Sequence, residues 1–162
     1  MKVKEVMMGA PYTCRWDSNL GEATRLMWIG NCGFVPVLGD DGRVRGVVTD
    51  RDICIALGTR NKLAGDISVC EVASAKVHSC LPEDEIHVAL YTMRHGHVRR
   101  LPVVDADGRL VGVLSIDDIL MHAKATSSGQ IADVSTEEIV RTLRAINHRD
   151  LPLVANRHRA AA

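Results

Sequence analysis

Two stretches of the chain carry apolar residues at helical spacing, and each is followed by a short apolar run of strand length. Ala23 and Met27 belong to the first stretch, and Ala89 and Met93 take the matching places in the second. Apolar residues three or four positions apart share one helix face, whereas a run of about four to eight bounded by turn residues is typical of a strand. Each half is therefore predicted to hold an extended segment, a helix, two strands and a closing helix. These elements cover residues 11–16, 20–30, 34–38, 43–49 and 50–57, then 77–80, 84–95, 98–104, 109–115 and 116–124.

The two halves are copies of one unit. Residues 35–52 read VPVLGDDGRVRGVVTDRD and residues 101–118 read LPVVDADGRLVGVLSIDD, so Gly46 lies 66 positions (112 − 46) before its counterpart Gly112. The spacing holds without a gap through turn, strand and helix start, as in a duplicated supersecondary unit. One unit alone leaves a sheet face uncovered, and two units packed face to face bury it. The chain is therefore predicted to be an α/β (α+β) protein of two repeats with pseudo-twofold symmetry.

The predicted boundaries follow from the duplication. Turn residues rich in glycine and aspartate separate the two strands of each copy, because they tolerate the positive φ angles of tight hairpins. Gly58 is predicted to end the last helix of the first copy, since glycine is common just beyond a helix C-terminus. The predicted regions are a first repeat over 1–61, a linker over 62–71, a second repeat over 72–125, and a linker with a helical tail over 126–162.

The tail has its own helix signal. The sequence TSSGQ is typical of a linker, and Ser135 and Glu138 are spaced as in a capping box that opens a helix running to about Asn147. The last residues, NRHRAAA, are expected to be frayed. One apolar stripe follows the helix, and it either covers the module's own helices or docks on another subunit. The stripe consists of Ile139, Leu143 and Ile146.

Composition narrows the function. The 162 residues hold 20 basic and 20 acidic side chains, which give no overall electrostatic reason to bind nucleic acid or an acidic membrane. The longest apolar runs are far shorter than the roughly 18 residues of a membrane span, and the N-terminus lacks the apolar core of a signal peptide. We therefore expect a cytoplasmic protein whose phosphate site, if it has one, is local.

Cysteines and histidines suggest no metal site or catalyst. The five cysteines have no CxxC spacing, so reduced structural thiols are expected, and the apolar neighbours of Cys32 and Cys54 favour core packing. His95 and His97 are two positions apart, a spacing that does not share a helix face. No Gly-x-Ser-x-Gly, HExxH or GxxxxGK signature is present, so we expect a protein that is not an enzyme and needs no obligatory cofactor.

The repeated motif resembles a known family. A Gly-apolar-apolar-Ser/Thr-x-x-Asp pattern, preceded by an apolar-Pro-Val strand and an Asp-Gly-Arg turn, resembles the CBS domain, and two in tandem resemble a CBS pair, or Bateman module. The resemblance covers roughly Lys2 to Ala125. It implies a flat pseudo-twofold module whose central cleft binds adenosine compounds such as AMP, ADP, ATP or S-adenosylmethionine. It also implies a regulatory role and a homodimer.

The motif residues suit such a ligand. Gly46 and Gly112 let a planar ring approach the backbone. Thr49 and Ser115 stand where a strand passes into a helix, whose unpaired N–H groups suit phosphate, and an aspartate three residues later can accept two hydrogen bonds from a ribose diol. The same spacing is also an ordinary capping box without a ligand, worth about 1 kcal/mol. Both interpretations remain open at this point.

The two clefts are not expected to be equal. Arg99 and Arg100 precede the strand of the second copy, and basic residues aligned with them reach the phosphates in adenylate-binding relatives of the family. The alternative is that both arginines pair with nearby aspartates at a solvated strand start. The first cleft lacks these arginines, so it is expected to be empty or to hold an uncharged, nucleoside-like ligand. The candidate residues are Ser115, Asp118, Arg99, Arg100, Val113 and Tyr12 of the preferred cleft, and Thr49, Asp52 and Arg51 of the other.

The expected function is a free-standing sensor. It binds an adenine nucleotide as a regulatory ligand between its repeats and passes the binding energy to a separate effector protein. The alternative is a ligand-free dimeric interaction or stress-response module, in which the motif residues only cap helices.

Overall fold

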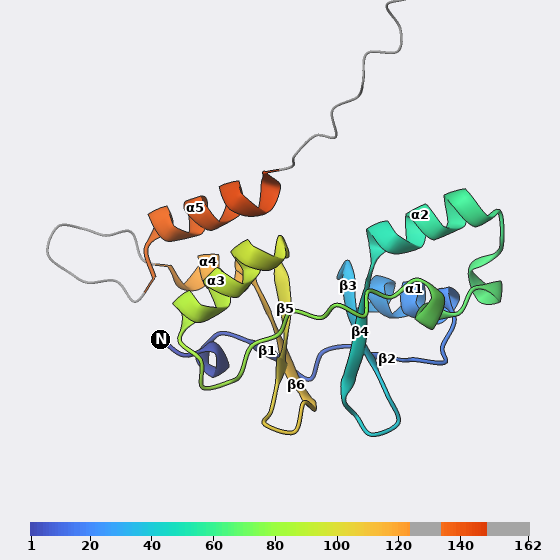
Figure 1. Cartoon of the computed structure of the whole chain (residues 1–162), viewed down its shortest axis with the longest axis horizontal. Helices are drawn as coiled ribbons and strands as arrows, with labels where there is room; N and C mark the ends of the chain where they lie inside the picture. Colours follow the sequence, from blue (N-terminus) through green and yellow to red (C-terminus); the bar gives the residue numbers. More distant parts are fainter. Residues whose placement is uncertain (124–133, 149–162) are drawn as a thin grey trace, which may run out of the picture.

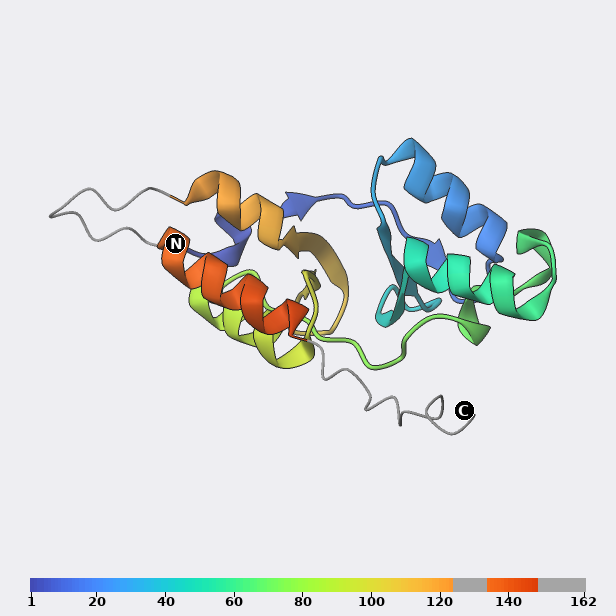
Figure 2. The ribbon, with the colours of Figure 1, turned by 90° about the horizontal axis from the view of Figure 1, so that it is seen from above.

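A computed structural model describes residues 1–123 and 134–148, which form two lobes side by side (Figures 1 and 2). The hairpins of the two lobes adjoin in the middle, and the helices lie outside them. The first lobe contains β2 (Cys14–Arg15), α1 (Leu20–Ile29), β3 (Phe34–Leu38), β4 (Val44–Thr49), α2 (Asp50–Arg60) and the 3-10 turns η2 (Ala64–Asp66) and η3 (Val69–Glu71). The second contains η1 (Val3–Glu5), β1 (Met8–Gly9), α3 (Ile86–Gly96), β5 (Arg100–Val104), β6 (Leu110–Ser115), α4 (Ile116–His122) and α5 (Thr136–Asn147).

Each lobe is built on one three-stranded sheet. In the first, β3 lies between β2 and β4, parallel to β2 and antiparallel to β4. In the second, β6 lies between β1 and β5 and is antiparallel to both. The register of the two hairpins shifts at the same place, next to Val37 in one and next to its counterpart Val103 in the other. The duplication seen in the sequence is therefore kept in the register of the hairpins, while the third strand of each sheet differs in its partner and direction.

The backbone is symmetric about the hairpin turns. Arg43 and Arg109 are counterparts in the two repeats, and they form an antiparallel bridge with each other. Beside them the N–H of Val44 donates to the carbonyl of Gly108 at 3.3 Å. A pair that exchanges places under the symmetry lies on its axis, so the pseudo-twofold axis passes between the two turns.

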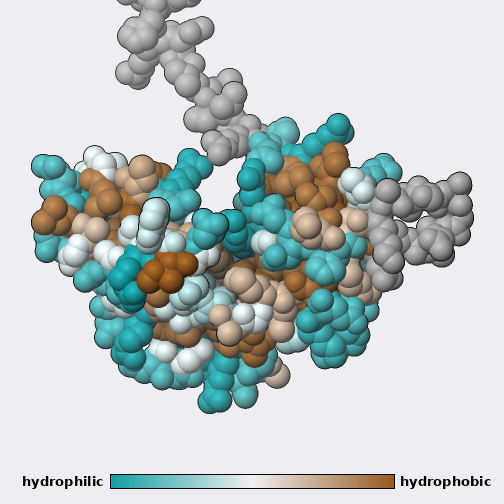
Figure 3. Space-filling model, turned by 180° about the vertical axis from the view of Figure 1, so that it is seen from behind, coloured by the Kyte–Doolittle hydropathy of each residue, from teal (hydrophilic) through white to brown (hydrophobic). Residues whose placement is uncertain are grey.

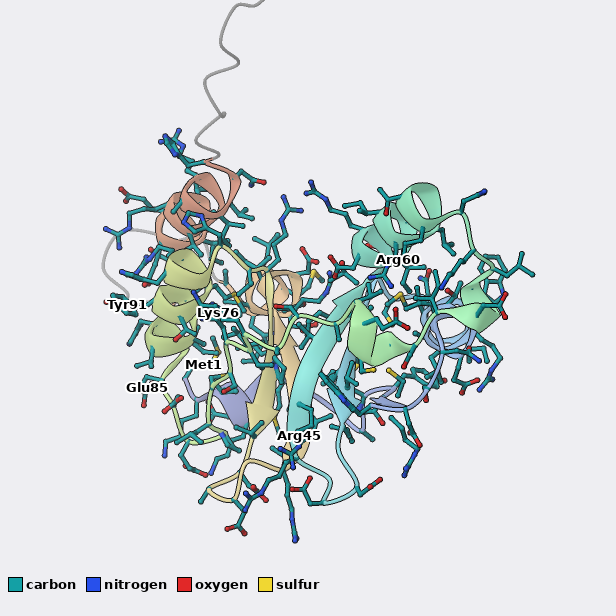
Figure 4. All side chains as sticks on the ribbon, turned by 45° about the vertical axis from the view of Figure 1, so that its right-hand side comes forward. Met1, Arg45, Arg60, Lys76, Glu85 and Tyr91 are labelled. Carbon is teal, nitrogen blue, oxygen red and sulfur yellow. The ribbon has the colours of Figure 1, made fainter. Side chains whose placement is uncertain are left out.

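The lobes exchange their lead-in segments. The N-terminal segment crosses to the second lobe, where the terminal ammonium of Met1 lies 3.3 Å from a carboxylate oxygen of Glu85 (Figure 4). Val3 is buried in the core of that lobe. In the same way Ile67 and Val69, within the predicted linker 62–71, are buried in the core of the first lobe. The segment between the repeats is thus part of the fold.

Helix ends follow local capping chemistry. The helix α2 does not end at Gly58 as predicted but continues to Arg60, where the guanidinium donates to Glu71 at 2.7 Å (Figure 4). Asn61 takes the left-handed conformation (φ 51°) that ends the helix, because asparagine tolerates it better than most residues. The helix α3 begins at Ile86, two residues later than predicted.

The tail helix α5 belongs to the second lobe. It packs mainly on α3 and also contacts α4. Ile139 and Ile146 are buried in the core of this lobe, and Leu143 is packed against it. This confirms the first of the two predicted roles of the apolar stripe, which is to cover the module's own helices. The predicted linker TSSGQ and the frayed end lie outside the described residues.

Candidate functional site

The Ser115 motif forms a reciprocal helix cap at the start of α4. The N–H and Oγ–H of Ser115 donate to Oδ2 of Asp118 at 2.8 Å and 2.6 Å, and the N–H of Asp118 donates back to Ser115 Oγ at 3.1 Å. All three bonds use one carboxylate oxygen or the hydroxyl. No described residue donates to the other oxygen, Oδ1, so it keeps its capacity to accept a ligand's hydrogen bonds.

The first repeat contains the same cap. The N–H and Oγ–H of Thr49 donate to Oδ2 of Asp52 at 3.0 Å and 2.7 Å, and the N–H of Asp52 returns a bond of 3.2 Å. Both aspartates are half-buried. The capping interpretation of the motif is therefore correct for both copies, and it leaves one carboxylate oxygen of each aspartate for a ligand.

The two motif glycines lie close to the backbone of the lead-in segments, a contact that the sequence did not predict. A Cβ at Gly112 would stand 2.9 Å from the carbonyl oxygen of Met8, and a Cβ at Gly46 would stand 3.0 Å from that of Ser74. Real Cβ atoms essentially never come within 3.0 Å of such an atom, so Gly112 is needed for the lead-in segment to cross the sheet, and at Gly46 the neighbouring segment would have to shift by a few tenths of an ångström. The open approach for a planar ring that we expected at these positions is filled by the chain itself.

The structure separates the two arginines of the second repeat. Arg100 lies directly across the hairpin from Ser115, and its side chain has no hydrogen-bond or ion-pair partner among the described residues. Arg99 is exposed, and its Nη2 donates to Oδ1 of Asn147, the last residue of α5, at 2.7 Å. The backbone of Arg99 stays beside the motif, because its carbonyl accepts from the N–H of Ile116 at 2.9 Å. Within residues 1–123 and 134–148, neither arginine pairs with an aspartate.

The first repeat offers no basic side chain at the matching places. Phe34 lies across the hairpin from Thr49, where the second repeat has Arg100. Gly33 stands in the place of Arg99, and a Cβ there would meet the carboxylate of Asp50 at 2.5 Å. Arg51 is exposed on α2, and its side chain has no partner within the described part of the chain. This strand start is therefore apolar and acidic.

The two expected wall residues lie in different surroundings. Val113 is 5% exposed, and its strand position pairs with Met8 of β1. Tyr12 is half-exposed and lies against Gly30, where an added Cβ would stand 2.6 Å from its ring. Gly30 ends α1 of the first repeat. The structure thus shows Tyr12 as a neighbour of helix α1.

A notch lies between the two lobes. Figure 3 shows it from behind as a hollow in the outline, rimmed mostly by hydrophilic residues. In Figure 1, β4 and β6 both run toward the top of the picture before they enter α2 and α4. A second hollow of about 570 Å³ lies at the start of α1 and is lined by the four acids Asp17, Glu22, Asp66 and Glu71, among other residues. Carboxylates repel phosphate, so this hollow does not suit a nucleotide.

The two buried cysteines, Cys14 and Cys80, lie in surroundings that do not make them nucleophilic. Cys14 and Cys80 are counterparts in the two repeats, and burial raises the pKa of their thiols to about 11 and about 12. Both are therefore protonated at neutral pH. Cys32 is partly buried against the first core. Cys54 was expected in the core as well, but it is exposed on α2, because the buried face of that helix consists of Ile53 and Ala56.

Residues 1–123 and 134–148 contain neither a metal-binding cluster nor a membrane-spanning helix. Within these ranges no group of three or more histidine, cysteine, aspartate or glutamate side chains is placed to hold a metal ion. No helix there has the length and apolar character to span a membrane.

Duplicated α/β lobes, exchanged lead-in segments and a Ser/Thr-x-x-Asp cap at each closing helix define a tandem-repeat module. The profile of the CBS domain matches residues 3–59 and 69–125, so the chain belongs to the CBS domain family.

Relatives of two kinds resemble the chain. The CBS domain-containing protein YhcV of Bacillus subtilis is 31% identical over 126 residues, which are 78% of this chain and 88% of YhcV. The homoserine O-acetyltransferase of Methanohalophilus mahii is 34% identical over 119 residues, 74% of this chain, but the chain spans only 24% of that enzyme's length. Among solved structures, the CBS domain protein PAE2072 from Pyrobaculum aerophilum, complexed with AMP, is 29% identical with a TM-score of 0.66. That match covers 73% of this chain and 89% of PAE2072.

Proposed function

We propose that the chain is a regulatory module that senses an adenosine-containing nucleotide, such as AMP, ADP, ATP or S-adenosylmethionine, in the cleft of its second repeat. The observation that carries the proposal is the arrangement at the strand ends: Arg100 faces Ser115 across the hairpin, and Asp118 keeps one oxygen without a partner among the described residues. A cation suits the phosphate of a nucleotide, and a free carboxylate oxygen can accept hydrogen bonds from its ribose hydroxyls. The AMP complex of PAE2072 supports the choice of ligand class.

Each residue has a proposed role. Asp118 accepts hydrogen bonds from the ribose diol, Arg100 and Arg99 bind phosphate, and Val113 and Tyr12 supply apolar contact. In the first repeat Thr49, Asp52 and Arg51 form a weaker cleft, because no arginine stands at its strand start. We propose no catalytic role for any of these residues.

The module then acts through a separate partner. Ligand binding shifts the population of conformations, and a cytoplasmic effector protein responds to that shift. A homodimer is part of this proposal, because several large apolar side chains stay exposed on the helices of the first repeat. They include Trp28, Ile29 and Ile55, which are exposed by 86%, 52% and 51%.

The alternative function is a ligand-free dimeric interaction module. The observation in its favour is that both motif aspartates already have a structural task as helix caps. On this alternative the free carboxylate oxygens contact only water.

A thermal-shift panel separates the two functions. AMP, ADP, ATP, S-adenosylmethionine, NAD and adenosine are each added in large excess. A ligand at a hundred times its dissociation constant stabilises the protein by about 2.7 kcal/mol, which is on the order of 5 to 10 °C at this chain length. The sensor predicts a clear rise in melting temperature with a phosphorylated compound. No rise with any of the six would overturn it in favour of the ligand-free module.

A further inference from the structure

The C-terminal end of α5 is hydrogen-bonded to Arg99, one of the two residues proposed to bind phosphate. Oδ1 of Asn147 accepts a hydrogen bond of 2.7 Å from Nη2 of Arg99. Nδ2 of the same amide donates to the carbonyl of Leu143 at 2.8 Å, which holds the amide with its oxygen toward Arg99. The guanidinium also lies at the end of the helix that carries the negative end of its dipole.

The rest of α5 is held differently. Ile139 and Ile146 are buried in the core of the second lobe. Arg94 Nη1 donates to Oγ1 of Thr142 at 3.4 Å, a long contact to a fully buried hydroxyl. Ile146 holds the inner face of the last turn by apolar burial, whereas Asn147 is exposed and its side-chain oxygen is held from outside the helix by Arg99.

Arg99 stands between the helix and the proposed nucleotide site. Its carbonyl accepts from Ile116 N at 2.9 Å, so its backbone is anchored beside the Ser115 motif, while its side chain is exposed and turned to α5. A guanidinium that binds phosphate through two nitrogens uses Nη2 in either fork, together with Nε or with Nη1. Asn147 takes one of the two N–H groups of that nitrogen and so blocks one of the two forks, and phosphate is the stronger acceptor because it is charged.

We propose that Asn147 and a ligand phosphate compete for Arg99, so that binding of a phosphorylated nucleotide frees the Asn147 side chain and loosens the C-terminal end of α5. This inference rests on the proposed nucleotide site and names how that site is coupled to the tail. The first repeat has no such coupling, since Gly33 replaces the arginine there. The free end of α5 is then the element that a partner protein reads.

The experiment measures AMP and adenosine binding by calorimetry in the full chain. Asn147→Ala removes the competitor, and it should bind AMP roughly fivefold more tightly, as expected for one hydrogen bond, with adenosine unchanged. Asn147→Asp strengthens the hold on Arg99 and should weaken AMP alone. Arg141→Ala is the control, because Arg141 is exposed on the same helix and its side chain has no partner within the described residues.

Hydrogen exchange supplies an independent reading. AMP, but not adenosine, should speed amide exchange over residues 143–148 of the wild-type protein. If wild type binds AMP while both Asn147 variants keep its affinity and the exchange does not change, the coupling is overturned and the nucleotide site stands. If wild type binds neither AMP nor adenosine, the nucleotide site and the coupling are both overturned.

Discussion

Thr49 in the first repeat lies across its hairpin from Phe34, whereas Ser115 in the second lies across from Arg100. The two caps are otherwise alike, with hydroxyl to carboxylate distances of 2.7 Å and 2.6 Å. Both copies keep the same helix cap, but the residue across the hairpin from the cap differs. A cap stabilises the start of a helix in either copy, and a nearby cation adds affinity for phosphate. The comparison separates what the motif does for the fold from what it does for a ligand.

The outer helices differ as well. The tail helix α5 covers α3 of the second repeat, while the matching helix α1 of the first repeat leaves Trp28 86% exposed. Leu90 of α3 is fully buried in the second core, and its counterpart on α1 is the exposed Thr24. The sequence difference between the two helices thus follows from what covers them.

The largest expected effect concerns the packing of α5 on α3. Ile139→Ala leaves a cavity between α5 and α3 and should lower the free energy of unfolding by about 2 to 5 kcal/mol. Val140→Ala on the exposed face of the same helix α5 should change it by less than about 0.5 kcal/mol. Urea unfolding measures both. An equally small loss for the two variants would mean that α5 contributes nothing to the core of the second lobe.

The next effect concerns the feature that both repeats share. Gly112→Ala and Gly46→Ala each force a Cβ against a backbone oxygen and should each cost about 1 to 3 kcal/mol of stability. Gly58→Ala is the matched control, because nothing lies within 4 Å of its Cβ, and it should raise stability by about 0.5 to 1 kcal/mol as an interior helix residue. A Gly112 variant that keeps its stability and loses AMP binding would show that the glycine serves the ligand instead.

The third effect sharpens the difference between the strand starts. Arg100→Ala removes a charge-assisted hydrogen bond and should weaken AMP binding by roughly 10- to 100-fold, with adenosine unchanged. Arg51→Ala in the first repeat should leave the affinity of the second-repeat cleft for both ligands unchanged. Calorimetric titration of the two variants measures this. Equal losses for AMP and adenosine in Arg100→Ala would contradict a phosphate contact.

The smallest effect is electrostatic. Glu83 of the second lobe accepts hydrogen bonds from Lys2 and Lys4, which lower the pKa of its carboxyl from 4.5 to about 2. A lowered carboxyl pKa adds stability above pH 4.5, and this contribution is lost as the pH falls toward 2. Glu83→Gln should therefore flatten the pH dependence of the melting temperature within that window. The effect should be small and should fade in high salt, because Glu83 is fully exposed.

An unchanged slope in Glu83→Gln would mean that this ion pair does not fasten the N-terminal segment to the second lobe. Its counterpart in the first lobe is Asp17, whose carboxyl pKa is lowered by a hydrogen bond from Arg15. Asp17→Asn is therefore the matched control, and it should act in the same direction.

The sequence was sufficient to predict the repeated order of helices and strands, because apolar periodicity and turn residues are local signals. It could not predict the exchange of lead-in segments, since Val3 and Val69 are each buried in the lobe of the other repeat. That exchange depends on long-range packing, which leaves no local pattern. The close approach at Gly112 was open to prediction in principle, because glycine inside a strand often marks a neighbouring backbone.

The local geometry of the candidate site could be predicted from the sequence, but the directions of its side chains could not. The cap geometry of Ser115 and Asp118 followed from their spacing alone. The turn of Arg99 toward Asn147 did not, because these two residues meet only through the docking of α5, 48 positions further along the chain. The place of Tyr12 against α1 is likewise a tertiary contact.

The most direct test is the stoichiometry of AMP binding in two matched variants. Asp118→Ala and Asp52→Ala each remove one helix cap and should each lower stability by about 1 kcal/mol. Asp52→Ala is expected to bind AMP at the stronger cleft of the second repeat with the affinity of wild type, and Asp118→Ala is expected to lose binding at that cleft. Binding that survives Asp118→Ala and is lost in Asp52→Ala would place the nucleotide in the first repeat and contradict the site proposed in the second.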